Sequence, residues 1–350
     1  PGSSTPVCEE LRFDNETKDF YTLNRNGIVE VIREESFLSS GNSSLSYDFT
    51  ESTGDDFYNQ SLIWNTTQPD VLTFNLPSGV IKTESLEFKN KSELKNKQVI
   101  FSGNGLGETF IDAKTSSEID ISFENMVVKF NDMEFTKNVT LNFINSDVYL
   151  NDVRLTDITT LSSNLSGEES VYFSPNETIN LAKSNADFED ANFTFDKSTS
   201  SIGLNLTDSK VILGNSSLNN NSSGGIGVLV DQTSSLHLRG EFYFNNLDLL
   251  SGFSINSSGK LTISNSSIHS NNDIDTIIYT KGNTDIKNSN ISMSTNIAHA
   301  ILLDEGSELT LNDSSIGNST GKPNFGVRDL GGAKFISGRN TNILATGLCW

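Results

Sequence analysis

The sequence predicts an all-β fold: a single-stranded right-handed parallel β-helix (a solenoid) with coils of about 25 residues and a non-repetitive N-terminal cap. Three observations predict it. A short motif returns at a nearly constant interval through most of the 350 residues. Alternating apolar residues lead into each copy of the motif, and a small polar turn residue comes shortly after the last of them. Charged residues make up only 20% of the chain, whereas Asn, Ser and Thr are abundant, which is typical of many short strands joined by capped turns.

The motif consists of an apolar residue, a variable residue, a small polar residue, two variable residues and a second apolar residue. Copies begin at positions 130, 150, 188, 213, 238, 263, 286 and 311, and the start of another is expected at Ile336. From 188 onward the intervals are 25 residues, with one of 23. Such regular spacing indicates structural units that stack on their neighbours rather than independent domains.

Strand periodicity gives each coil one apolar face. Val211 and Leu213 alternate with polar residues, as do Leu261 and Ile263, which directs these side chains to one side of a strand. A coil cannot bury that side alone and needs a neighbour above and below. The alternative is an antiparallel β-sandwich, which predicts turns roughly every 8–12 residues but no long-period register.

A ladder of turn residues is the main prediction for individual side chains. Asn and Asp tolerate a left-handed backbone and hydrogen-bond to their own main chain, so each can bend one strand into the next. In coils stacked in register they would also bond to one another along the helix axis. The predicted structural turn ladder comprises Asp132, Asp152, Asp190, Asn215, Asn265, Asn288 and Asp313.

Two domains are predicted. Residues 1–68 lack the repeat and are expected to form an N-terminal cap, because an open coil end would expose unpaired strand edges; a separate small binding domain is the alternative. Residues 69–350 are expected to form the β-helix. The interval of 38 residues between the copies at 150 and 188 exceeds one coil, so a protruding loop is expected near 161–177, where function would often lie.

The first predicted coils carry a resemblance to a known superfamily. The segment Val71–Ile81 contains a strand that leads into Leu76-Pro77-Ser78-Gly79, and Val99–Asp112 contains Gly103-Asn104-Gly105 followed by Thr109-Phe110-Ile111-Asp112. These motifs resemble the opening coils of pectin-lyase-like right-handed β-helix proteins. The resemblance covers about residues 70–345 and implies the fold, whereas the superfamily includes lyases, hydrolases, esterases, phage spikes and bacterial adhesins.

The sequence offers no catalytic, cofactor-binding or metal-binding motif. The three histidines, at positions 237, 269 and 299, lack the sequence contexts known from β-helix enzymes that act on uronate polymers, and acidic pairs are expected to be solvated turn residues. Cys8 and Cys349 stand at opposite ends, roughly 50 Å apart if ten coils intervene, too far for a disulfide unless a terminal segment folds back. We therefore expect no catalytic residues, no cofactor and no metal site.

Charge and composition limit the classes of partner that the protein is expected to bind. The formal net charge is −21 and basic residues do not cluster, which argues against nucleic acid, and no apolar stretch is long enough to insert into a membrane. By resemblance to the passenger domains of bacterial autotransporters, we expect a secreted or cell-surface adhesin, anchored in the outer membrane through a segment outside this sequence. Expected partners are a host cell-surface protein or glycan, with self-association as an option. The alternatives are a polysaccharide-degrading enzyme and a trimeric phage or viral fibre.

Overall fold

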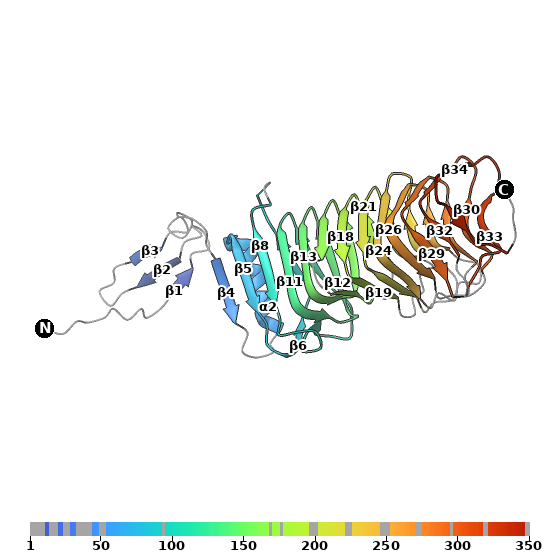
Figure 1. Cartoon of the computed structure of the whole chain (residues 1–350). Coiled ribbons are helices and arrows are strands. Elements are labelled where there is room, and N and C mark those ends of the chain that lie inside the picture. Colours follow the sequence, from blue (N-terminus) through green and yellow to red (C-terminus); the bar gives the residue numbers. More distant parts are fainter. Residues whose placement is uncertain are drawn as a thin grey trace. The chain divides into compact units, whose positions relative to one another are not determined.

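A computed structural model gives the architecture of the chain (Figure 1). It describes residues 11–13, 20–23, 29–32, 44–48, 54–92, 95–167, 170–175, 178–195, 202–220, 226–245, 253–270, 275–294, 297–317 and 321–346. Cys8 and Cys349 lie outside these ranges, so the prediction about their pairing stays a prediction.

The chain divides into two compact units between Ser44 and Leu45. The first contains an antiparallel three-stranded sheet of β1 (Leu11–Phe13), β2 (Phe20–Leu23) and β3 (Val29–Ile32), in which β2 pairs with both neighbours. The second contains the repeats. It also contains helix α2 (Gly54–Thr67) and β4 (Ser44–Asp48) apart from Ser44, although both fall within the predicted cap of residues 1–68.

Helix α2 and strand β4 pack against the first coil of the stack. The indole of Trp64 is fully buried and lies edge-on to Phe88, with ring centroids 6.5 Å apart. Tyr47 of β4 stacks on Phe74 at 6.4 Å. These contacts cover apolar side chains that the first coil would otherwise expose to water.

The prediction of an all-β right-handed parallel β-helix is confirmed, because strands one coil apart pair in parallel along three sheets. Sheet 1 has eleven strands. They are β7 (Leu86–Lys89), β10 (Ile119–Glu124), β12 (Val139–Ile144), β14 (Asp157–Leu161), β17 (Ile179–Ala182), β20 (Ile202–Thr207), β23 (Ile226–Val230), β25 (Phe253–Ser257), β27 (Thr276–Thr280), β30 (His299–Leu303) and β33 (Phe325–Asp329).

Sheets 2 and 3 meet at a sharp corner, and four long strands run through it from one sheet into the other. These are β11 (Val127–Phe135), β13 (Asp147–Leu155), β24 (Ser235–Asn245) and β26 (Lys260–Ser270). Sheet 2 further contains β5 (Val71–Asn75), β8 (Gln98–Ser102), β15 (Asn164–Gly167), β18 (Asn185–Glu189), β21 (Lys210–Gly214), β28 (Asn283–Lys287), β31 (Glu308–Asn312) and β34 (Lys334–Ser337). Sheet 3 further contains β6 (Gly79–Thr83), β9 (Thr109–Ala113), β16 (Val171–Phe173), β19 (Ala191–Phe195), β22 (Ser217–Asn220), β29 (Asn290–Met293), β32 (Ser315–Ile316) and β35 (Asn342–Ile343).

The interior is a continuous column of apolar side chains. In the first coils it consists of stacked phenylalanines: Phe88 lies 5.3 Å from Phe123, which lies 5.6 Å from Phe143. In later coils aliphatic residues such as Ile263 and Leu311 take over and are fully buried. Each coil therefore shields the apolar face of the next, as the alternating pattern in the sequence predicts.

The register follows the sequence repeat through six copies and then departs from it. The first apolar positions of the copies at 188, 213, 238, 263, 286 and 311 lie directly opposite one another. The prediction that the last copy begins at Ile336 is wrong by one residue in register, because Ser337, and not Ile336, lies opposite Leu311. Phe335 takes the inward position opposite Leu309, and Ile336 points outward with 39% of its surface exposed.

The loop expected near 161–177 is a wrong prediction for the described residues 161–167 and 170–175, because they contribute two strands to the stack. Strands β15 and β16 pair in parallel with the coils on either side. The motif does not detect this coil, because Gly167 occupies the position where other copies have a large apolar residue. A Cβ atom there would lie 2.6 Å from a methyl group of Val171, so the position admits no side chain without rearrangement.

Buried serines connect the coils at the corner between sheets 1 and 2. The backbone N–H of each of the first four serines donates to the hydroxyl of the serine one coil later, over 2.9–3.2 Å. Four of these hydroxyls in turn donate to the carbonyl two residues earlier. The five serines are at most 4% exposed. They are Ser146, Ser163, Ser184, Ser209 and Ser234.

Removing one hydroxyl from this serine ladder should destabilise the fold. Ser184→Ala leaves the N–H of Ser163 and the hydroxyl of Thr160 without their partner, so we expect a loss of about 1–3 kcal/mol. The half-buried Ser166 on the outer face of β15 provides the control, Ser166→Ala. Urea unfolding followed by circular dichroism measures both variants. Equal midpoints for the two would show that the ladder does not stabilise the stack.

Candidate binding groove

The predicted turn-ladder residues all lie at the corner between sheets 2 and 3. Each has a positive φ, between 42° and 56°. A side-chain bond joins two of them: Asn288 Nδ2 donates to Asn265 Oδ1 over 3.2 Å. Asn215 donates instead to Glu189 over 2.6 Å, and Asp313 accepts a bond of 3.0 Å from Asn340. The structure thus places the seven residues in one row of corners, with a side-chain bond between Asn265 and Asn288.

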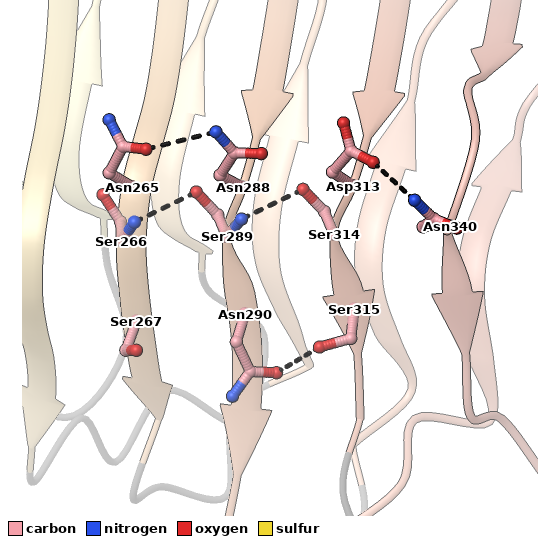
Figure 2. A pocket seen from close by; sticks show the side chains of 10 residues that line it. All are labelled: Asn265, Ser266, Ser267, Asn288, Ser289, Asn290, Asp313, Ser314, Ser315 and Asn340. Carbon is pink, nitrogen blue, oxygen red and sulfur yellow. Dashed lines mark hydrogen bonds between the residues drawn. The ribbon is translucent and has the colours of Figure 1, made fainter.

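Towards the C-terminal end of the described stack this corner is hollowed into an open groove of about 600 Å³. Figure 2 shows that the lining comes from successive coils, so the groove crosses the strands and follows the stacking direction. The lining forms three rows: corner residues, buried serines, and the first outward residues of sheet 3. They are Asn265, Asn288, Asp313 and Asn340; Ser266, Ser289 and Ser314; and Ser267, Asn290 and Ser315.

The serine row fixes the floor of this groove. Ser266 N–H donates to Ser289 Oγ over 3.2 Å, and Ser289 N–H donates to Ser314 Oγ over 3.1 Å. The three serines are at most 5% exposed, so their hydrogen-bonding capacity is used within the protein. The corner and outward rows therefore present the groups that a ligand would meet.

Those two rows retain unused hydrogen-bonding groups. Among the described residues, Ser267 Oγ and the Nδ2 atoms of Asn265 and Asn290 have no side-chain partner. Asn288 Oδ1 and Asp313 Oδ2 likewise have no side-chain partner within the described ranges. The groove thus offers both donors and acceptors on successive coils, with one carboxylate and no cation in its lining.

A second hollow of about 560 Å³ lies across the corner, on the outer face of sheet 2. Asp313 lines both hollows. The second hollow is charged, with Lys260 and Lys287 beside Asp285 and Glu308. Its mixture of signs contrasts with the amide and hydroxyl lining of the groove.

The three histidines do not assemble into a site. His237 lies on sheet 2, His269 on sheet 3 and His299 on sheet 1. Burial lowers the pKa of His299; the carboxylate of Asp275 opposes this shift and the guanidinium of Arg328 adds to it. A neutral His299 can accept the bond of 3.0 Å that Arg328 Nη1 donates to its Nε2. This histidine therefore helps to dock β33 on β30.

Two further arginines have structural partners. Arg154 pairs with the buried Glu134 at 3.1 Å, and Arg239 contacts Asp187 and Glu189, each at 3.1 Å. Among the described residues no group of three or more His, Cys, Asp or Glu side chains could hold a metal ion. The expectations of no catalytic residue, no cofactor and no metal remain predictions.

Within the described ranges, no helix is both long and apolar enough to cross a membrane.

Sequence reasoning identified the corner row but missed the groove. The motif does not mark Asn290, Ser315 or Asn340 as groove residues, because it leaves the two positions after each corner residue variable. A signal was present, because an Asn or Asp followed by Ser recurs at 215, 265, 288 and 313. The concavity itself depends on how the corners of successive coils align, which single motifs do not specify.

The role of the corner residues can be tested at Asp190, whose φ is 56°. Asp190→Val places a β-branched residue in a left-handed backbone and should destabilise the protein by about 1–2 kcal/mol. Asp190→Gly removes the same carboxylate but accommodates the positive φ, so it should be much closer to wild type. Thermal unfolding distinguishes the two. If glycine and valine were equally harmful, the backbone requirement would not be the cause.

Comparison with protein-family models gives no match, and comparison with curated proteins gives none either. Among solved structures the chain is similar to the Agl-KA catalytic domain, with 14% identity, 85% of this chain and 69% of that chain covered, and a TM-score of 0.46. The A-module of the mannuronan C-5 epimerase AlgE6 from Azotobacter vinelandii shows 11% identity over 86% of this chain and 100% of that chain, with a TM-score of 0.42. An alginate lyase from Paenibacillus sp. str. FPU-7 shows 8% identity over 85% of this chain and 99% of that chain, with a TM-score of 0.38. All three TM-scores are below 0.5, so these likenesses assign no activity to the chain.

Proposed function

We propose that this protein is a secreted or cell-surface binding protein that holds an extended polysaccharide along the groove between sheets 2 and 3. The observation that carries the proposal is the unused hydrogen-bonding capacity of the corner and outward rows, repeated coil after coil. The hydroxyl groups of a polysaccharide both donate and accept, so they match a surface that offers both.

The shape of the groove favours a long ligand. It is open along the stacking direction, and its lining recurs at the strand spacing of about 4.8 Å. A polymer lying in it would make many similar contacts, each of them weak. Once one segment is bound, the next binds as an intramolecular event, so weak contacts along the chain combine into useful affinity.

The charges of the groove disfavour polyphosphate ligands. Nucleic acids need lysines or arginines that neutralise phosphates, and the lining contains neither. The formal net charge of −21 adds a repulsive field around the protein. A glycan on a host cell or on a like cell fits these constraints better, and binding it would serve adhesion.

The proposal predicts that polysaccharide binding depends on the outward row of the groove. In the double variant Ser267→Ala with Asn290→Ala, the affinity for a bound polysaccharide should fall about tenfold or more, because two hydrogen-bonding groups per segment are lost. A glycan array identifies the polymer, and titration calorimetry measures the affinity of wild type and variant.

The control is Ser217→Ala with Asn192→Ala. These residues are also half-buried neighbours on the outer face of sheet 3, but they lie outside the groove. The control should bind like wild type. Equal affinity for both double variants would place the ligand elsewhere, and release of shorter oligosaccharides during the titration would favour the alternative of a polysaccharide-degrading enzyme.

A further inference from the structure

An ordered pair of rings lies beside the groove. Tyr243 on β24 and His269 on β26 are paired positions on the outer face of sheet 3, and their rings stack at 4.8 Å with an angle of 18°. Tyr243 Oη donates to Glu241 over 2.7 Å, and His269 Nδ1 lies 2.7 Å from Ser292 Oγ. These bonds hold both rings in place before any ligand arrives.

His269 shares strand β26 with the groove, whereas Tyr243 lies on the neighbouring strand β24, which contributes no residue to the lining. Ser267, in the outward row, and His269 are two residues apart on β26 and face the same side, so roughly 7 Å separates them along the strand. Both rings are half-buried and therefore expose part of their apolar surface. A ligand that extends beyond Ser267 meets an apolar wall after a polar floor.

Carboxylates supply the charge at this site. Glu241 is exposed and lies opposite Ser267 on the neighbouring strand, so it stands where the groove meets the rings. Asp313 lines the groove and leaves one carboxylate oxygen without a side-chain partner among the described residues. Lys260 and Lys287 line the hollow on sheet 2 and not the groove.

We infer that the groove selects polysaccharides of neutral pyranose sugars and rejects those that carry carboxylate or sulfate groups. This inference rests on the proposed function and specifies its ligand. A pyranose ring has hydroxyls at its edge for the Asn and Ser rows and C–H groups on its face for Tyr243 and His269. A uronate would bring its carboxylate near Glu241 and Asp313, and the groove lining contains no Lys or Arg that could offset the repulsion.

The test compares wild type with Glu241→Gln combined with Asp313→Asn. Both substitutions keep the shape and an acceptor oxygen for Tyr243 and Asn340, and asparagine also tolerates the positive φ at position 313. The probes are a neutral glucan, a neutral galactomannan, alginate and polygalacturonate, measured at low and at high salt. Wild type should bind a neutral polymer at least about tenfold more tightly than either uronate at low salt.

The double variant should bind uronates several-fold more tightly than wild type does, so the ratio of its affinity for the neutral polymer to its affinity for uronates should fall. A charge-matched control, Glu118→Gln with Glu305→Gln, removes two carboxylates outside the groove and should leave the discrimination intact. Tyr243→Ala should weaken neutral binding more than Tyr243→Phe does, because phenylalanine retains the ring and loses only the bond to Glu241.

The outcomes separate the two proposals. If wild type binds uronates as tightly as neutral polymers, or if the double variant gains no uronate binding, the inferred selectivity is overturned and the groove remains a polysaccharide site. If the control variant gains as much as the groove variant, the selectivity comes from net charge and not from this site. If no polysaccharide binds, the proposed function is overturned and the inference with it.

Discussion

The structure depends on one constraint: the corners of each coil must lie directly above the corners of the coil before it along the stacking direction. At the corner between sheets 2 and 3 the chain meets this constraint with a residue in a left-handed conformation, such as Asn265, followed by a buried serine, such as Ser266. The first residue bends the chain sharply from one sheet into the next, and the hydroxyl of the second satisfies an N–H of the neighbouring coil that no strand pairing reaches. The corner between sheets 1 and 2 repeats the arrangement, for example at Asp208 and Ser209.

Once the corners align, the apolar column follows, because inward positions one coil apart then face one another. The outer surface inherits the same register. A polar residue at a given place in the repeat becomes a row of polar residues along the stack, and the groove consists of such rows. Histidines at different places in their coils end up on different sheets, which is why His237, His269 and His299 do not assemble. In this fold, whether residues come together in a site depends on the position that each one occupies within its coil, here called its phase. The number of residues between them in the sequence matters less.

Phase also explains what could be predicted from the sequence. Six repeat positions and the seven corner residues could be located because each carries a residue type that the backbone requires, an apolar side chain or an Asn or Asp with positive φ. The prediction failed where that residue type changed. Gly167 replaces a large apolar residue, so an entire coil was mistaken for a loop. At the last repeat an extra residue makes Phe335 the inward residue in place of Ile336. The groove lay beyond prediction because its concavity comes from several coils together.

The central claim is that neighbouring coils lie in register, and engineered disulfides test it most directly. In a chain with Cys8 and Cys349 replaced by serine, Asn185→Cys is combined either with Lys210→Cys, its direct neighbour in the next coil, or with Ile212→Cys, two residues further along. In-register neighbours stand about 4.8 Å apart, within the Cα separation that a disulfide spans, whereas the shifted pair stands roughly 8 Å apart. Rapid oxidation of the first pair and slow or absent oxidation of the second, measured by free-thiol titration of the folded protein, is the predicted result. Equal oxidation of both pairs, or faster oxidation of the shifted pair, would contradict the stacking on which the fold and its groove depend.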